Sequence, residues 1–225
     1  MKIGIICHSS FGGSARVATE LALALAQRGH RVHLFTRTTP FGDLNYPGGV
    51  MLHTVVPEGE DDFHPARLYT EWPAGELQAL VSRILDVIAT EGLDVLHFHY
   101  AVPFAFVAAQ VRHCLGQEAP VLVGTLHGTD VFIHGRDSVK GPQLSQALHH
   151  LDALTTVSVS HARLSAEVFE LCTRPEVIFD FVNLSKFRPQ NPLPTSPYEG
   201  DSFPPACGGD RGGGQGSSTS PTSDR

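Results

Sequence analysis

The first 36 residues carry the pattern that most restricts the fold: a strand, a glycine turn, a helix and a second strand. Residues 2–8 are a β-branched, apolar run that predicts a strand, and the turn that follows contains Gly12 and Gly13. From Ser14, a candidate helix cap, apolar residues recur with helical spacing until Gly29, and residues 31–36 then alternate as a strand does. Such a β-α-β unit implies a parallel sheet, because parallel strands need a crossover connection.

The same alternation continues to about residue 179. Strand patterns occur at 50–56, 94–99, 120–126, 153–157 and 176–179, and helical patterns at 74–90, from Pro103, at 144–151 and at 160–172. The sequence therefore predicts an α/β domain with a parallel sheet and helices on both faces. Ligands of these sheets bind beyond the carboxyl ends of the strands, so the polar clusters that follow strands are the candidate sites.

Charge and hydropathy exclude two classes of partner. The net charge of -7, with only 16 lysines and arginines, gives no basic surface for nucleic acid. No apolar run approaches the ~18–20 residues that span a bilayer, which excludes a membrane partner. Four scattered cysteines without a Cys-x-x-Cys pair favour reduced, buried thiols and a cytoplasmic protein.

The composition changes near Asn191. Proline, glycine, serine and threonine dominate from there, and almost nothing remains to bury. We expect a folded domain over residues 1–189 and a disordered tail over residues 190–225.

The turn Gly12-Gly13-Ser14 is the first candidate site. It lies between a strand and a helix amino terminus, where free backbone N–H groups and the helix dipole favour a phosphate or carboxylate. A tight turn that needs glycine only for its backbone angles explains the same residues equally well. The turn lacks the Gly-Lys-Ser/Thr of a Walker loop and the spacing of the dinucleotide fingerprint, which disfavours a nicotinamide enzyme.

Two further clusters follow later strands. Alternation along residues 94–99 places His97 and His99 on one face, with Tyr100 beginning the next loop. A metal bound there would need a third ligand from His127 or Asp130, and histidines in a hydrogen-bonded polar cleft are the more common arrangement. We therefore predict no metal.

The segment Thr125-Leu126-His127-Gly128-Thr129-Asp130 combines hydroxyls, an imidazole and a carboxylate at one strand end. The alternative is a capped turn, in which Asp130 accepts backbone N–H groups and Gly128 serves geometry alone. The remaining histidines of the helical stretches, His149, His150 and His161, are interpreted as surface residues without a role.

Several of these segments together resemble the family-4 glycosyltransferases. The resemblance covers about residues 1–189 and is specific only as a combination. Its motifs are Phe11-Gly12-Gly13-Ser14, Arg28-Gly29-His30, His97-Phe98-His99-Tyr100-Ala101-Val102-Pro103, Thr125-Leu126-His127-Gly128-Thr129-Asp130 and Thr155-Thr156-Val157-Ser158.

The resemblance implies the amino-terminal half of a GT-B fold, in which two Rossmann-like domains face each other. Within the family it points to transfer of N-acetylglucosamine from UDP-GlcNAc to the hydroxyl of L-malate, with retention of configuration and without metal or cofactor. By this resemblance, Gly12, Gly13 and Ser14 would lie at the diphosphate and acceptor. Tyr100 and Thr125 would hydrogen-bond malate, Asp130 would be a further substrate-binding residue, and His127 would be the catalytic residue beside the reacting sugar.

Two departures from the family pattern lead us to expect an incomplete chain. A second, donor-binding domain is expected where the Pro/Gly/Ser tail stands, and residues 177–183 replace the usual entry to it. A truncated or frameshifted reading frame would have this pattern, and the chain alone is then expected to be inactive. A non-catalytic carboxylate-binding fragment and a family member with another acceptor remain alternatives. The sequence is compatible with a homo-oligomer and does not determine the oligomeric state.

Overall fold

The computed structural model describes residues 1–40, 49–57, 70–182 and 184 of the chain. The first of its two compact units comprises Met1–Phe181. The predicted tail at 190–225 lies outside the described residues.

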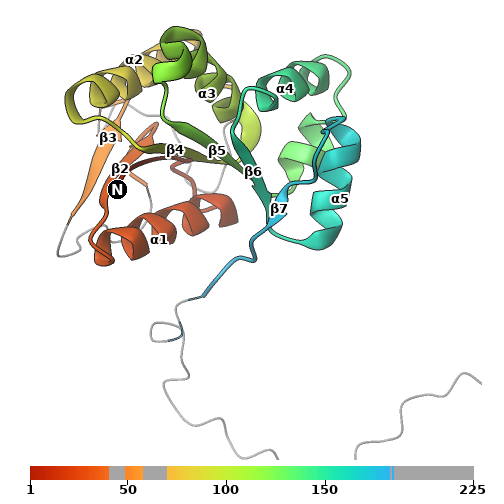
Figure 1. The fold of residues 1–225 in the computed structure, drawn as a ribbon, viewed down its shortest axis with the longest axis horizontal. Coiled ribbons are helices and arrows are strands. Elements are labelled where there is room, and N and C mark those ends of the chain that lie inside the picture. Colours follow the sequence, from red (N-terminus) through yellow and green to blue (C-terminus); the bar gives the residue numbers. More distant parts are fainter. Residues whose placement is uncertain (41–48, 58–69, 183, 185–225) are drawn as a thin grey trace, which may run out of the picture. The chain divides into compact units, whose positions relative to one another are not determined.

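Seven strands of the described residues form one sheet, in the order β3-β2-β1-β4-β5-β6-β7 (Figure 1). Their bounds are β1 (Lys2–Ile6), β2 (Arg31–Thr36), β3 (Val50–Thr54), β4 (Val95–His99), β5 (Val121–Leu126), β6 (Ala153–Thr156) and β7 (Glu176–Val177). Every neighbouring pair is parallel, which confirms the predicted sheet. Because the strands are parallel, all their carboxyl ends meet at one edge.

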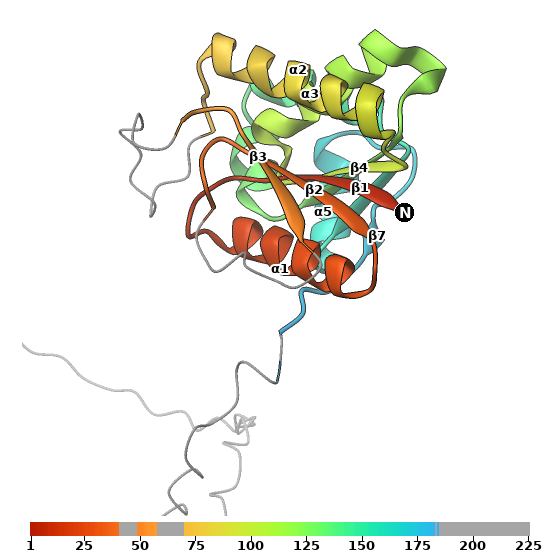
Figure 2. The same ribbon diagram turned by 90° about the vertical axis from the view of Figure 1, so that its left-hand side faces the viewer.

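Helices cover both faces of the sheet (Figures 1 and 2). Helix α1 (Gly13–Gln27) lies on one face, and α2 (Ala74–Glu91) and α3 (Ala101–Leu115) lie on the other. The buried side of α1 is a stripe of alanines at helical spacing, Ala18, Ala22 and Ala26, which lets the helix approach β1 and β2 closely.

The larger core lies between the sheet and the second helical layer. Phe98 and Phe104 are fully buried there, and α4 (Lys140–Leu148) contributes Leu144 and Leu148. The last helix, α5 (Val159–Val168), packs partly buried residues against this core. The two apolar layers hold the strand ends in place.

A glycine on β5 makes room for a fully buried phenylalanine of this core. Gly124 is paired with Phe98 of β4, and a Cβ on Gly124 would lie 2.4 Å from Cζ of that ring. A contact below 3 Å requires movement of the neighbour, and the ring is already fully buried. Glycine at this position is therefore a packing requirement.

Some local predictions were wrong in detail. Gly12, not Ser14, is the N-cap of α1, and no side chain caps this helix. Helix α3 begins two residues before Pro103, with non-helical backbone at Val102. Of the cysteines in the described residues, Cys7 is buried as predicted, but Cys114 and Cys172 are exposed.

Candidate active site

The carboxyl edge of the sheet gathers the polar residues that follow β1, β4, β5 and β6. Hydrogen bonds connect three of these strand ends directly. The backbone N–H of Tyr100, after β4, donates to Thr125 O on β5 at 2.9 Å, and the Thr125 hydroxyl lies 2.7 Å from that of Thr155 on β6. The edge is thus a connected surface.

The glycine turn after β1 leaves a helix amino terminus open. Gly12 has φ -61° and ψ 154°, an ordinary extended conformation, and Gly13 starts the helix with negative φ. A Cβ on Gly13 would meet no atom of the described residues within 4 Å. Neither residue therefore needs to be glycine for its backbone angles, and among the described residues no side chain caps the first N–H groups of α1.

Tyr100 is held in a strained, buried position. It has φ 79°, which is rare for a bulky residue, and its ring is almost completely buried. Its hydroxyl lies 2.7 Å from the Thr129 hydroxyl, and burial raises the pKa of the phenol. Strain of this kind persists where the surrounding structure fixes it, and it is common at functional sites.

Thr125 is the centre of a short hydrogen-bonded chain. Its hydroxyl lies 2.7 Å from Nε2 of His97 and 2.7 Å from the hydroxyl of Thr155. Burial lowers the pKa of His97 to about 4, so its imidazole is neutral at pH 7. Both neighbours occupy the Thr125 hydroxyl, which leaves one hydrogen-bonding position for a ligand.

His99 and His127 form a second pair across the same two strands. Nδ1 of His99 lies 3.1 Å from Nε2 of His127, and the ring of His97 stands 4.4 Å from that of His99. Burial, followed by the neighbouring imidazoles His97 and His127, holds the pKa of His99 well below its usual value. Burial also lowers the pKa of His127, and Asp130 opposes the shift.

Asp130 organises the loop after β5. It is fully buried at the start of the short π-helical turn η2 (Asp130–His134). Its carboxylate accepts hydrogen bonds at 2.7–3.2 Å from the backbone N–H groups of Ala101, His127, Gly128 and Val131. This arrangement is the capped turn that the sequence analysis gave as the alternative. The additional hydrogen bond from Ala101 connects the turn to the start of α3. Ligand contact by Asp130 stays a prediction.

The structure adds His8, which the sequence analysis did not select. His8 follows β1, and its ring is packed among Trp72, Tyr100 and Phe104 at centroid distances of 4.6–6.3 Å. Nε2 lies 3.0 Å from Val102 O, and burial lowers the pKa of the imidazole to about 4. The signal in the sequence was its place at a strand end. Its neutral ring packs against that of Tyr100 in an edge-to-face contact, with the ring centroids 5.4 Å apart.

The interpretation of His161 as a surface residue was wrong. Its ring is 5% exposed, packs 5.7 Å from Phe132, and has no hydrogen-bond partner in the described part of the chain. It lines a cavity of about 420 Å³ together with His127, Gly128 and Ser158, the residue that caps α5. A periodic helical pattern alone cannot show which face of α5 meets the η2 turn, and His161 lies on that face.

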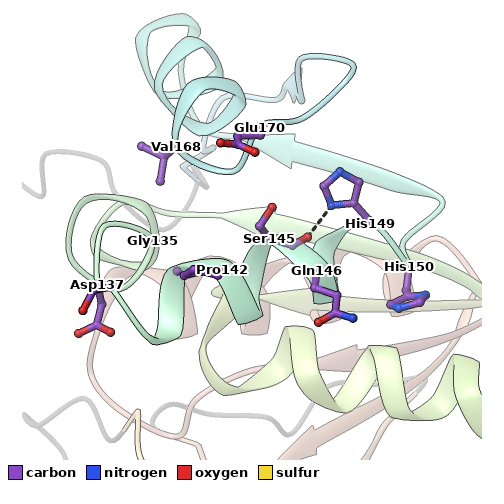
Figure 3. A pocket seen from close by; sticks show the side chains of 11 residues that line it. Gly135, Asp137, Pro142, Ser145, Gln146, His149, His150, Val168 and Glu170 are labelled. Atoms are coloured by element: carbon purple, nitrogen blue, oxygen red, sulfur yellow. Dashed lines mark hydrogen bonds between the residues drawn. The ribbon is translucent and has the colours of Figure 1, made fainter.

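A larger cavity lies elsewhere. It measures about 710 Å³ and lies between α4 and the end of α5, lined among others by Asp137, Ser145, His149 and Glu170 (Figure 3). His149 and His150 are exposed, as predicted. None of the predicted site residues borders this cavity, so it does not belong to the candidate site.

Metal binding has no geometric support in the described residues, where no group of three or more histidine, cysteine, aspartate or glutamate side chains is arranged so that it could hold a metal ion. In the same part of the chain, no helix is long and apolar enough to span a bilayer.

The family of this protein follows from its sequence match, which includes the residues of the strand-end site. Residues 11–186 match Glycosyltransferase Family 4, and the chain belongs to this family. It is 34% identical over 185 residues to N-acetyl-alpha-D-glucosaminyl L-malate synthase of Bacillus anthracis, a match that covers 81% of this chain and 46% of that protein. The chain thus spans about half the length of this relative.

Solved structures show the same fold at low identity. Sucrose-phosphate synthase of Thermosynechococcus elongatus matches 84% of this chain and 50% of its own, with a TM-score of 0.59 and 19% identity. Anabaena HepE, determined in complex with UDP and glucose, matches 82% of this chain and 46% of its own, with a TM-score of 0.50 and 12% identity. These matches confirm the predicted Rossmann-like domain of a GT-B fold.

Proposed function

We propose that this chain is the acceptor-side domain of a retaining glycosyltransferase that moves N-acetylglucosamine from UDP-GlcNAc to the hydroxyl of L-malate. The name of the 34% identical relative supports N-acetylglucosamine as the transferred sugar and L-malate as the acceptor. The chain corresponds to 46% of that relative, and we infer that a second, donor-binding domain is required for turnover. A cytoplasmic location, predicted from the scattered cysteines, is part of this proposal, and fractionation of cells expressing the protein would test it.

The observation that carries the proposal is the glycine turn. Gly12 and Gly13 have backbone angles open to any residue, so the geometric explanation of the turn does not account for them. Their missing side chains leave room at the positive end of a 15-residue helix. A diphosphate bound there would accept backbone N–H groups and be stabilised as it departs.

The acceptor would lie over Tyr100 and Thr125. A malate carboxylate only accepts hydrogen bonds, so each hydroxyl must direct its hydrogen to it. Thr125 can do so when Nε2 of His97 carries a hydrogen and Thr155 also donates to Thr125, because the single hydrogen of Thr125 is then free. Tyr100 can do so when the Thr129 hydroxyl donates to it.

Transfer then needs no protein nucleophile. The malate hydroxyl oxygen forms the new bond to the anomeric carbon, the bond from that carbon to the diphosphate oxygen breaks, and the hydroxyl proton passes to the departing UDP. His127 would hydrogen-bond the sugar, and Asp130 would hold the loop that carries His127. Positioning and stabilisation of the diphosphate supply the rate enhancement.

Activity is tested in a fusion of residues 1–181 to the carboxyl-terminal half of the Bacillus anthracis relative. We expect release of UDP from UDP-GlcNAc that depends on L-malate, and no turnover by the 225-residue chain alone. Transfer to another hydroxyl compound but not to malate would support the alternative acceptor. Malate-dependent turnover by the unfused chain would contradict the inference that a second domain is required.

The glycine turn is tested in the same fusion with Gly13→Ala. A methyl group there would occupy the space we assign to the diphosphate, and kcat/KM is expected to fall about tenfold or more, the cost of roughly 1.4 kcal/mol of transition-state stabilisation. Gly75→Ala is the matched control, because Gly75 also lies in the first turn of a helix and its Cβ would meet nothing within 4 Å. Equal kinetics for both variants would refute the assignment of the turn.

Calorimetric titration of the 225-residue chain with L-malate separates binding from catalysis. Tyr100→Phe and Thr125→Val are each expected to weaken binding, whereas Thr156→Val, a buried threonine on the neighbouring strand, is the control. A chain that binds malate while the fusion fails to transfer would favour the non-catalytic carboxylate-binding fragment. Absence of binding by the wild-type chain and by the fusion would contradict the malate assignment.

A further inference from the structure

We propose that His99 is a positioning residue that fixes the tautomer of His127, so that His127 presents an Nδ1–H donor to the ligand. The inference rests on the proposed function only in calling the bound molecule a sugar substrate. The pairing itself is a property of the chain without ligand. His99 is itself buried, and it acts through His127.

The contact allows two arrangements of one hydrogen. Nδ1 of His99 lies 3.1 Å from Nε2 of His127, so exactly one of these nitrogens must carry a hydrogen when both rings are neutral. In the first arrangement His99 donates from Nδ1, and its Nε2 is a bare acceptor. In the second, His127 donates from Nε2, and His99 must then carry its own hydrogen on Nε2.

The surroundings of His99 favour the first arrangement. Its Nε2 is buried and has no partner in the part of the chain that the structure describes. The second arrangement would bury an N–H group without an acceptor, and orphaned buried donors are rarer in proteins than under-satisfied acceptors. His99 is only 2% exposed, so bulk solvent does not reach this nitrogen.

The consequence for His127 follows from the neutral imidazole having a single hydrogen. With Nε2 accepting from His99, the hydrogen of His127 is on Nδ1. Among the described residues Nδ1 has no partner, and the half-buried ring lines the cavity of about 420 Å³. His127 therefore meets the ligand as a donor, and the group opposite it is an acceptor oxygen, such as a sugar hydroxyl or a phosphate oxygen. A resting role as general base is excluded for this nitrogen.

The test is nitrogen NMR of the chain labelled with ¹⁵N in its histidine rings, with His127→Gln identifying the His127 signals among the 13 histidines. We expect the Nδ1–H tautomer for His127 in the wild-type chain at pH 7. In His99→Leu the Nδ1–H pattern is expected to be lost in favour of Nε2–H, which free imidazoles of histidine prefer. His99→Asn, which offers an amide N–H in place of Nδ1–H, is expected to restore it.

His97→Leu is the matched control, because His97 lies on the same strand and face but bonds Thr125. Its His127 spectrum should equal that of the wild type. An Nε2–H tautomer in the wild type would overturn the proposal, and so would an unchanged Nδ1–H tautomer in His99→Leu. His99→Met repeats the latter test if the leucine variant does not fold. No ligand is needed, so this result is independent of whether malate is the acceptor.

Discussion

Replacement of the buried carboxylate Asp130 by asparagine is the most direct test of how the site is held together. The two side chains have the same shape, but one carboxylate oxygen becomes an amide group that donates hydrogen bonds. Asp130 accepts from four backbone N–H groups, and Oδ2 alone receives that of Ala101 at 3.1 Å. Whichever way the asparagine is oriented, at least one N–H group must face another donor.

The expected cost follows from this count. In the less costly orientation the amide replaces Oδ2, and the bond from Ala101 is lost, while Gly128 and Val131 keep Oδ1 as acceptor. A hydrogen bond to a charged group contributes about 1.5–3 kcal/mol, and a buried donor left without a partner costs about 1–3 kcal/mol. We expect Asp130→Asn to lower the free energy of unfolding by roughly 3–5 kcal/mol.

Urea unfolding of the 225-residue chain measures this loss, with the single tryptophan, Trp72, as a buried fluorescent probe. Asp137→Asn is the matched control, because Asp137 also accepts two backbone N–H groups, of Val139 and Lys140, but is exposed to water. Its variant should change the midpoint far less. Equally small losses in the two variants would refute the assignment of Asp130 as the organiser of the loop.

Two further predictions concern packing and pH. Gly124→Ala places a Cβ 2.4 Å from the Phe98 ring. We expect it to lower the free energy of unfolding by about 1–3 kcal/mol, as measured by urea unfolding. A variant as stable as the wild type would contradict the packing argument. Burial lowers the pKa of His8 and His97 from 6.5 to about 4, so between these values the unfolded chain binds protons that the folded chain excludes. The free energy of unfolding is therefore not reduced by these two histidines above pH 6.5. It falls as the pH drops toward 4, by up to about 1.4 kcal/mol per pH unit for each histidine. Urea midpoints at pH 7, 6 and 5 test this trend, and His8→Phe should reduce its slope.

The fold was predictable from the sequence because its signals are local. The alternation of apolar strands with amphipathic helices predicts a parallel sheet, and residues 31–36 form the predicted strand β2 without a change of bounds. The polar segments that follow strands were placed at one edge by the same rule. Helix ends were less accurate, since the start of α3 and the cap of α1 depend on contacts with other elements.

The tertiary structure alone decided what the polar residues do with one another. Sequence reasoning gave equal weight to two explanations of Gly12 and Gly13, anion binding and a turn that needs glycine for its backbone angles. The observed angles are open to any residue, so they contradict the second explanation. It could not show that His99 contacts His127 or that His161 is buried, because these contacts join segments far apart in the chain. The residues of the site are thus set by the sequence pattern of strands and loops. Their hydrogen-bond partners are set by the register of the strands and by the packing of helices over them.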